Sequence, residues 1–253
     1  MKITFLGTGT SQGIPVIGCA CEVCQSEDAK DKRLRVSILI EIGDQTLVVD
    51  IGPDFRQQML REQVQKVDSI LLTHEHNDHI SGLDDVRPLN FKHEMDMPVY
   101  AHPRVQKILH QAYPYIFEGT YPGVPRVVLH SISKDQPFYI GDTQIIPIEI
   151  MHGQLPILGF RIGNFAYLTD TKTIEEEELK KLEGLDVVVL NALHHFPHHS
   201  HLNLEEALEM TERINSKRTY FTHLSHMMGT HSSTQKSLPK HIQIAYDGLH
   251  IEV

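Results

Sequence analysis

One short segment constrains this chain more than any other: residues 71–79 have the sequence LLTHEHNDH. Four ligand-type side chains follow its apolar, strand-like start, namely His74, His76, Asp78 and His79. Imidazole and carboxylate groups are the ligands that Zn, Mn and Fe accept, so this spacing favours metal binding over a polar surface patch. The segment predicts half of a two-metal hydrolytic site at the end of a strand, followed by a helix from Ile80 onward.

The length of 253 residues is near the upper size of a single hydrophobic core, so we expect one domain over residues 1–253. No linker-like segment divides the chain, and its run of like charge, residues 175–178, suggests the solvated face of a helix. The N-terminus enters a strand pattern without a signal-peptide core, and no apolar run approaches membrane-spanning length. These features predict a cytoplasmic protein without a membrane partner.

The formal net charge of −10 argues against a broad nucleic-acid-binding surface, because such surfaces neutralise phosphates with Lys and Arg. A phosphate ester remains compatible with this charge, since two bound divalent ions would add about four positive charges at one place. The 18 His residues are many for this length. Some of them must be explained either as metal ligands or as coincidence.

Short apolar runs predict many strands and fewer helices. Strands are expected at 1–7, 36–42, 45–50, 67–73, 99–101, 126–130, 138–140, 143–150, 158–162, 165–169, 187–190, 219–222, 243–246 and 249–252. Helices are expected at 54–63, 105–111, 174–182 and 204–214, the last with Asn203 as N-cap and Glu206 three residues later. Many strands with interspersed helices suggest packed sheets covered by helices.

Three further ligand candidates lie at the ends of predicted strands: His152, Asp170 and His223. Strand ends hold side chains rigidly at one rim of a sheet, so residues distant in sequence can converge there. Taken singly, a His after a strand is more often a surface or core residue than a ligand. Together with the first cluster, the spacing favours one shared metal site.

This ligand series, in this order, resembles that of the metallo-β-lactamase superfamily over essentially the whole chain. Within the superfamily, the chain is most similar to the PhnP-like phosphoribosyl cyclic phosphodiesterases. Four segments carry this similarity: Leu6-Gly7-Thr8-Gly9-Thr10-Ser11-x-Gly13-x-Pro15, Cys19-x-Cys21-x-x-Cys24, Asp50-Ile51-Gly52-Pro53-Asp54-Phe55-Arg56 and Ser200-His201-Leu202. The resemblance implies an α/β (α+β) fold, the four-layer αββα sandwich.

The resemblance also implies two catalytic metal ions, Mn or Zn with Fe as a third option. One ion would be held by His74, His76 and His152, the other by Asp78, His79 and His223, with Asp170 bridging them. Such ions lie about 3.5–4 Å apart and share a hydroxide that attacks phosphorus. Asp78 is counted among the catalytic residues as well as among the ligands.

A His protonates the leaving oxygen in the similar phosphodiesterases, and His201 matches its position. Imidazole suits this task because its ordinary pKa of about 6.5 allows either form at neutral pH. The alternative is an incidental His-rich loop or a weak adventitious metal site, which is the favoured interpretation for His198 and His199. The resemblance places Asp50 under the metal loop, where it either accepts a hydrogen bond from a ligand His or simply ends a strand.

The three cysteines, Cys19, Cys21 and Cys24, lie in a long loop between the first two predicted strands. An odd number cannot all pair, and without a secretory signal we expect no disulfide. His226 is the fourth ligand that would complete a closed, structural Cys₃His zinc, as the similar proteins carry, and would fasten this loop. Free or redox-active thiols are the alternative.

The expected function is a metal-dependent phosphodiesterase that hydrolyses a small cyclic phosphodiester, such as phosphoribosyl 1,2-cyclic phosphate, with a hydroxide activated by two metals. A thioester hydrolase of the glyoxalase II kind would use the same ligand set. An RNA-processing nuclease is disfavoured because the sequence has no long basic, Gly-Pro-rich arm. A metal-stabilised scaffold is the non-enzymatic alternative. The resemblance further suggests a homodimer.

Overall fold

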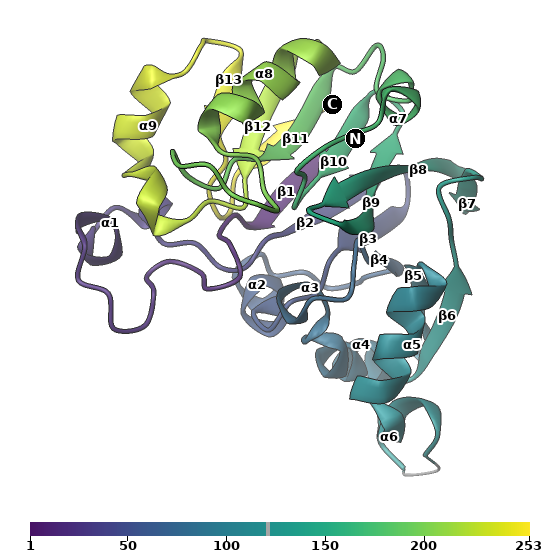
Figure 1. Ribbon diagram of the computed structural model, residues 1–253. Helices are drawn as coiled ribbons and strands as arrows, with labels where there is room; N and C mark the ends of the chain where they lie inside the picture. The colour runs from purple at the N-terminus through teal and green to yellow at the C-terminus, as the bar shows by residue number, and fades with distance from the viewer. Residues whose placement is uncertain (120–121) are drawn as a thin grey trace.

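The computed structural model describes residues 1–119 and 122–253, and its strands form two seven-stranded sheets (Figure 1). The first sheet has the order β14-β1-β2-β3-β4-β5-β6. Its strands are β1 (Lys2–Gly7), β2 (Ser37–Ile42), β3 (Gln45–Val49), β4 (Ser69–Leu71), β5 (Met97–Ala101), β6 (Val127–Ser131) and β14 (His250–Glu252). Because β14 pairs with β1, the two ends of the chain meet, and the amino group of Met1 donates to the Val253 carbonyl at 2.9 Å.

The second sheet comes from the C-terminal half of the chain and has the order β13-β12-β11-β10-β9-β8-β7. Its strands are β7 (Phe138–Ile140), β8 (Thr143–His152), β9 (Leu155–Ile162), β10 (Phe165–Leu168), β11 (Val187–Asn191), β12 (Arg218–Thr222) and β13 (Ile242–Ile244). The strands from β10 to β13 are parallel, so their carboxyl ends lie at one rim of the sheet. In the first sheet, β3 to β6 are parallel as well.

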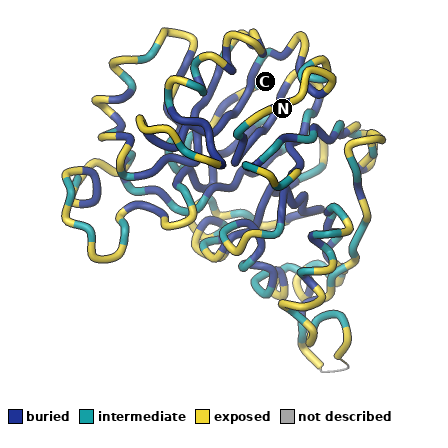
Figure 2. Tube along the Cα trace, in the orientation of Figure 1, coloured by how far each residue is buried: buried dark blue, intermediate teal, exposed yellow. Residues whose placement is uncertain are grey.

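The two sheets pack face to face over an apolar layer that includes Phe5, Ile38, Phe160 and Val189. Helices α2 (Phe55–Arg61), α4 (Arg87–His93) and α5 (Pro103–Ala112) cover the outer face of the first sheet. Helices α7 (Glu176–Lys180), α8 (Leu204–Ile214) and α9 (His231–Ser237) lie over the second. Figure 2 shows the buried residues concentrated on the strands between these layers. The αββα sandwich predicted from the sequence is therefore confirmed.

Short helices occupy the connections. They are α1 (Glu22–Gln25), η1 (Ala29–Asp31), α3 (Asn77–Ile80), η2 (Leu83–Val86), α6 (Pro114–Phe117) and η3 (His226–Met228). A close backbone approach fixes α3 against the turn after β3, because a Cβ on Gly52 would lie only 2.0 Å from the Asp78 carbonyl oxygen. This position thus requires glycine and keeps α3 beside the first sheet.

Each expected strand and helix has a counterpart, and α8 has the predicted bounds and capping box, with Glu206 N donating to the Asn203 side chain at 2.9 Å. Several bounds differ from the predicted ones by a few residues, and three differences have a clear physical reason. The helix expected from Ile80 ends there and begins at Asn77, because the extended backbone of His76 caps it. Strand β8 continues two residues past its predicted end, so His152 is its last residue.

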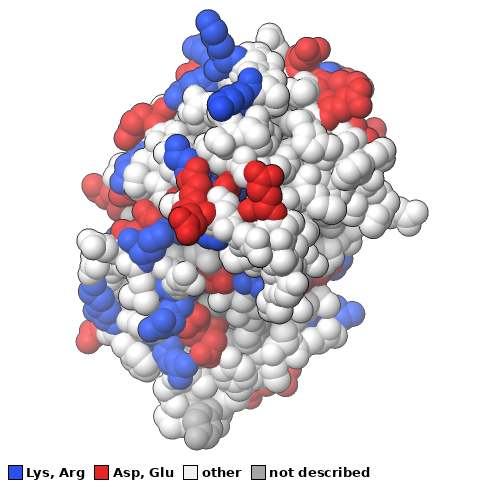
Figure 3. Space-filling view, turned by 90° about the vertical axis from the view of Figure 1, so that its left-hand side faces the viewer, with Lys and Arg blue, Asp and Glu red and all other residues white. Residues whose placement is uncertain are grey.

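The third correction concerns the acidic run at residues 175–178, which is not wholly a solvated face. Glu178 is buried and accepts a hydrogen bond from Glu149 N at 2.8 Å, because α7 packs against β8. On the face shown in Figure 3, acidic and basic side chains lie intermixed, and wide areas carry neither. None of the helices in residues 1–119 and 122–253 has the length and apolar run that a bilayer crossing requires.

Candidate metal centre

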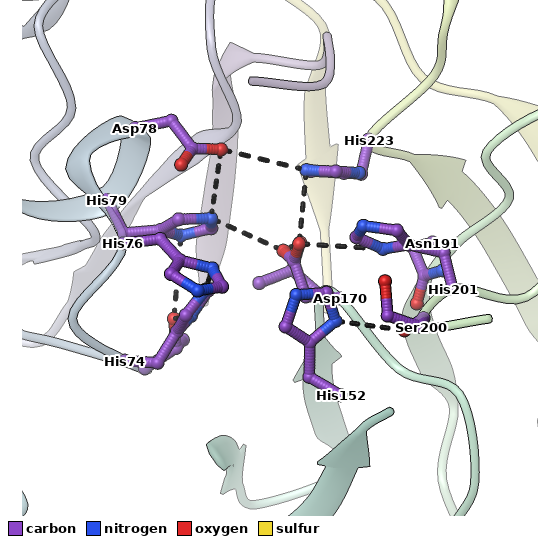
Figure 4. A network of polar contacts seen from close by, with 12 residues as sticks. His74, His76, Asp78, His79, His152, Asp170, Asn191, Ser200, His201 and His223 are labelled. Carbon is purple, nitrogen blue, oxygen red and sulfur yellow. Dashed lines mark hydrogen bonds and ion pairs between the residues drawn. The ribbon is translucent and has the colours of Figure 1, made fainter. Parts of the chain in front are cut away.

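The seven predicted metal ligands converge where the two sheets meet at one rim (Figure 4). The first sheet contributes the β4–α3 loop with His74, His76, Asp78 and His79. The second contributes His152 at the end of β8, Asp170 after β10 and His223 after β12. Ligand atoms lie within 4.8 Å of one another in four groups: His74, His76 and His152; His74, His79 and Asp170; Asp78, His79 and His223; His152, Asp170 and His201.

Asp170 lies in the middle of this cluster, where a bridging ligand is expected (Figure 4). Its Oδ2 is 3.4 Å from His79 Nε2, and its Oδ1 is 3.2 Å from His223 Nε2. Asp78 closes the other side, with its Oδ2 3.4 Å from His79 Nε2 and 3.9 Å from His223 Nε2. Two carboxylates and two imidazoles therefore surround a common space.

Hydrogen bonds behind the rings set their orientation. His74 Nδ1 lies 2.9 Å from Thr73 Oγ1, and His152 Nδ1 lies 2.9 Å from the carbonyl oxygen of Ser200. His79 Nδ1 lies 2.7 Å from Asp50 Oδ2. When each Nδ1–H donates in this way, the lone pair of Nε2 is left free toward the centre, as in metal-binding histidines.

Asp50 occupies the first of the two roles left open for it, since it contacts a ligand-type histidine rather than merely ending a strand. Its fully buried carboxylate also accepts from Thr73 N and Thr73 Oγ1, each at 2.9 Å. Burial raises the pKa of Asp50, and the positive charge and hydrogen bond of His79 oppose the rise. One side chain thus joins the end of β3, the metal loop and α3.

Three residues of this rim adopt left-handed backbone conformations: Asp50 with φ 63°, Asp170 with φ 58° and His223 with φ 55°. Such values are uncommon for residues other than glycine, and they often occur at functional sites. Each of the three follows directly or within two residues after a strand, where the turn directs the side chain into the rim.

The electrostatics favour charged carboxylates, whereas the rings differ from one another. Burial would lower the pKa of His79, but the neighbouring carboxylates of Asp50, Asp170 and Asp78 raise it well above its ordinary value. Burial holds the pKa of His74 well below its ordinary value and also lowers that of His152. Burial alone would raise the pKa of Asp78 and Asp170, but the neighbouring His79 and His223 hold both well below the ordinary value. Neutral imidazoles offer lone pairs and carboxylates offer negative charge, which is the donor set of a divalent transition metal.

A metal ion also fits the buried atoms that lack partners. Within the part of the chain that the structure describes, His79 Nε2 and both ring nitrogens of His223 are buried without a hydrogen bond. Buried polar atoms are rarely left unpaired, so such atoms call for an explanation such as a bound ion. The surrounding residues therefore suit divalent ions by position, by the chemistry of their donor atoms and by their unsatisfied atoms.

His201 lies at the edge of the same pocket. Its ring centroid is 4.5 Å from that of His152 and 4.8 Å from that of His223, and its Nδ1 is 3.5 Å from Asp170 Oδ1. Burial, together with the nearby His223, lowers the pKa of His201 to about 2. The predicted catalytic histidine is thus adjacent to the predicted ligands.

The four residues predicted for a structural zinc also come together. His226 Nδ1 lies 3.3, 3.4 and 3.6 Å from the sulfur atoms of Cys19, Cys21 and Cys24. A tetrahedral zinc with bonds of about 2.0 Å to nitrogen and 2.3 Å to sulfur has N···S edges of about 3.6 Å. The backbone N–H of Cys24 and the His226 ring lower the pKa of Cys21 to about 6, which favours the thiolate that zinc binds. Burial raises the pKa of Cys24 to about 11, so a bound cation would have to displace the proton of that thiol.

Sequence reasoning missed several residues that hold the site in place. Thr73 joins Asp50 to His74, and its position directly before the first ligand was the available signal. Asn191 accepts from Thr171 N at 2.6 Å beside Asp170, and Arg104 pairs with Glu75 at 2.7 Å in the metal loop. These last two contacts join distant segments, and the sequence gives no pattern that predicts them.

Comparisons with known proteins agree with this fold. Residues 45–224 match the family model described as a beta-lactamase superfamily domain. A crystal structure of a diphosphatase from the PhnP family is 40% identical, covers 99% of this chain and 96% of its own, and has a TM-score of 0.93. Human short-form tRNase Z shares the fold, with a TM-score of 0.75, 17% identity and coverage of 100% and 99%.

Among curated proteins, one from Porphyromonas gingivalis named octanoyltransferase is 42% identical over 253 residues, which is 98% of this chain. The coenzyme PQQ synthesis protein B of Xanthomonas campestris is 27% identical over 171 residues, or 62% of this chain. The alignments include 51% and 54% of these relatives. The chain therefore spans about half the length of the curated relatives it matches.

The contacts of Asp50 predict a role in metal affinity. Replacing it as Asp50→Asn removes the charged acceptor that fixes His79, so we expect divalent metal binding to weaken by about 10- to 100-fold. Competition with a chromogenic chelator measures this change. Asp44→Asn, on the exposed turn between β2 and β3, is the matched control and should bind metal like the parent. Equal affinities for parent and Asp50→Asn would contradict the role.

Proposed function

Because the chain belongs to the metallo-β-lactamase superfamily and is PhnP-like, we propose that this hydrolase is a metal-dependent phosphodiesterase. Its substrate would be a small cyclic phosphodiester similar to phosphoribosyl 1,2-cyclic phosphate. The observation that carries the proposal is His201, whose ring lies beside His152 and His223 of the ligand cluster, within reach of a substrate bound there. The 40% identity to a PhnP-family diphosphatase across nearly both whole chains supports phosphoryl chemistry.

The proposed ligands of one ion are His74, His76 and His152, and those of the other are Asp78, His79 and His223. Asp170 would contact both, in keeping with its central position. Divalent ions bound there supply Lewis-acid chemistry, polarising a phosphoryl oxygen and lowering the pKa of water. The sequence-based choice among Mn, Zn and Fe stays a prediction.

The chain's own residues would do the remaining work. Asp50, Thr73 and the Ser200 carbonyl fix the direction of three rings, so the phosphodiester meets a preorganised pocket. His201 would donate to the leaving oxygen from Nε2, with its Nδ1 turned toward Asp170. An unprotonated ring supplies no proton, so this role requires the charge of the bound substrate to raise the pKa of His201 from its low value.

Other activities are less well supported. Thioester hydrolysis of the glyoxalase II kind would use a similar ligand set. Its leaving group is not an alkoxide, so the reaction would not need a general acid such as His201. RNA processing is suggested by tRNase Z, but at 17% identity that similarity concerns the fold alone. One relative is named octanoyltransferase, but it is about twice as long as this chain and only 51% of it is matched. We therefore do not extend that activity to this chain.

A substrate panel tests the proposal. We expect the metal-loaded protein to hydrolyse bis(4-nitrophenyl) phosphate and phosphoribosyl 1,2-cyclic phosphate, and to leave a glutathione thioester intact. The three measurements are the release of nitrophenol, the formation of ribose bisphosphate by ring opening and the release of free thiol. Turnover of the thioester alone would overturn the phosphodiesterase assignment.

His201→Ala tests the proposed acid. General acid catalysis typically contributes about 10²- to 10⁴-fold, so we expect a loss of this size in kcat for a cyclic sugar phosphate. The loss should be smaller for bis(4-nitrophenyl) phosphate, because nitrophenolate leaves without a proton. Metal content should not change, and exposed His241→Ala serves as the control. Full turnover of the sugar phosphate by a metal-replete His201→Ala protein would rule out this role.

The cysteine cluster predicts a third, structural zinc that is distinct from the catalytic ions. Cys21→Ser removes one of four ligands from a closed site, so we expect the metal content to fall from about three to about two ions per chain. Elemental analysis of parent and variant measures this, and the Tm of the variant should fall too. Finding only two metals in the carefully prepared parent would contradict the third site.

A further inference from the structure

Arg35 is a cation at the same rim as the metal pocket. It lies two residues before β2, which is antiparallel to β1 and β3, so the start of β2 shares a rim with the ends of both neighbouring strands. Asp50, which contacts His79, follows β3 at this rim. The side chain of Arg35 is 31% exposed, so a ligand at this rim can reach it.

Arg35 lies between two segments that carry proposed metal ligands. On one side it forms a β-bridge with Gly9, which forms a second bridge with the residue that follows His223. Bridged segments are about 4.8 Å apart, so only one backbone separates Arg35 from the His223 segment. On the other side, a Cβ on Gly52 would lie 3.6 Å from the Cβ of Arg35 and would also meet the carbonyl of Asp78. Arg35 is therefore next to the half of the pocket that Asp78 and His223 form.

Hydrogen bonds hold the guanidinium of Arg35 in one orientation. Its Nε donates to the Ser11 carbonyl at 3.1 Å, and its Nη1 donates to the two carboxylate oxygens of Asp54 at 3.0 and 3.2 Å. The backbone N–H of Arg35 also donates to Asp54, at 2.8 Å. A guanidinium has five N–H donors, and within residues 1–119 and 122–253 these contacts leave Nη2 without an acceptor. Nη2 is thus a positioned, charged donor that is free to bind an anion.

The proposed substrate carries an anion that needs such a donor. Besides its cyclic diester, phosphoribosyl 1,2-cyclic phosphate has a phosphate monoester on C5 of the ribose. With the diester at the metal pocket, this monoester lies one sugar ring away from the reacting phosphorus and requires a cation of its own. Guanidinium groups suit phosphate oxygens, because their planar N–H donors form charge-assisted hydrogen bonds that are stronger than neutral ones.

We propose that Arg35 binds the phosphate monoester of the substrate through Nη2 and so determines specificity. The inference rests on the proposed function, which places the cyclic diester at the metal pocket. It narrows the substrate class from small cyclic phosphodiesters in general to those that carry a second, terminal phosphate. Asp54 and the Ser11 carbonyl hold the guanidinium in place, so little side-chain freedom is lost when the phosphate binds.

The test compares two ligands that differ only in the terminal phosphate, ribose 1-phosphate and ribose 1,5-bisphosphate. Titration calorimetry with the metal-loaded protein measures their Kd values without requiring turnover. A charge-assisted hydrogen bond contributes about tenfold or more in affinity, so the bisphosphate should bind at least about tenfold more tightly. Arg35→Gln should remove this preference and leave the Kd of ribose 1-phosphate unchanged. Arg35→Lys keeps the charge without the planar fork, so it should retain part of the preference.

Kinetics give a second readout. Arg35 contacts a group remote from the bond that breaks, so Arg35→Gln should raise KM for phosphoribosyl 1,2-cyclic phosphate by about tenfold and leave kcat nearly unchanged. The kinetic constants for bis(4-nitrophenyl) phosphate, which has no second phosphate, should stay the same.

Arg126 is the matched control, since it pairs with Asp96 at the same distance of 3.0 Å but lies before β6, at the opposite rim of the first sheet. Arg126→Gln should keep the full preference for the bisphosphate. Equal affinities for the two ligands in the parent, or a preference that survives Arg35→Gln, would overturn the contact. An Arg35→Gln protein that binds both ligands equally more weakly would show a structural role instead, which also overturns it.

These outcomes are separate from the fate of the proposed function. A protein that cleaves cyclic phosphodiesters but has no preference for the bisphosphate loses the Arg35 contact alone. An Arg35-dependent preference in a protein that is inactive on every phosphodiester would overturn the proposed function and keep the anion site.

Discussion

The hydrogen bonds of the Asp50 carboxylate are the interaction on which the metal centre depends most directly. They join the end of β3 to the loop after β4 and to α3, so the two segments that carry His74 and His79 share one anchor. Because this carboxylate is buried, an N–H or O–H group left without it as an acceptor would destabilise the fold by about 1–3 kcal/mol. Close to this carboxylate, the backbone of Gly52 approaches the Asp78 carbonyl so closely that no larger residue fits at position 52. Ligand direction is therefore set by groups that do not themselves face the pocket.

The same rim contains unfavourable backbone geometry. Asp50, Asp170 and His223 have left-handed conformations, which in residues other than glycine cost of the order of 1–3 kcal/mol each. The sheet around two of these turns holds them firmly, since β10, β11 and β12 are each paired on both sides, and β10 and β11 are buried along their whole length. The favourable packing of the apolar layer thus offsets the cost of these three turns, which direct the side chains into the rim. Such strained backbone is often found at functional sites.

Much of this arrangement was predictable from the chain. Short apolar runs located the strands, and the spacing of His, Asp and Cys, together with the family resemblance, predicted the residues that the fold brings together in the metal pocket and in the cysteine cluster. Residues such as Arg104 and Asn191 were not predictable, because their partners are brought close only by the fold. The start of α3 was misplaced because ligand residues, rather than an apolar helix pattern, fill it. The solvation of Glu178 depended on tertiary packing that local sequence does not encode.

The division of the proposed ligands between the two sheets has a mechanical consequence. A divalent ion held by His76 and His152, or by Asp78 and His223, would cross-link the two sheets, which otherwise pack mainly through apolar contacts. Ligands that bind only the native state add stability, about 2.7 kcal/mol at a free concentration one hundred times Kd. Metal supply in the cell would then govern how long each molecule survives as well as how fast it turns over, because a metal-starved chain would open at this rim first.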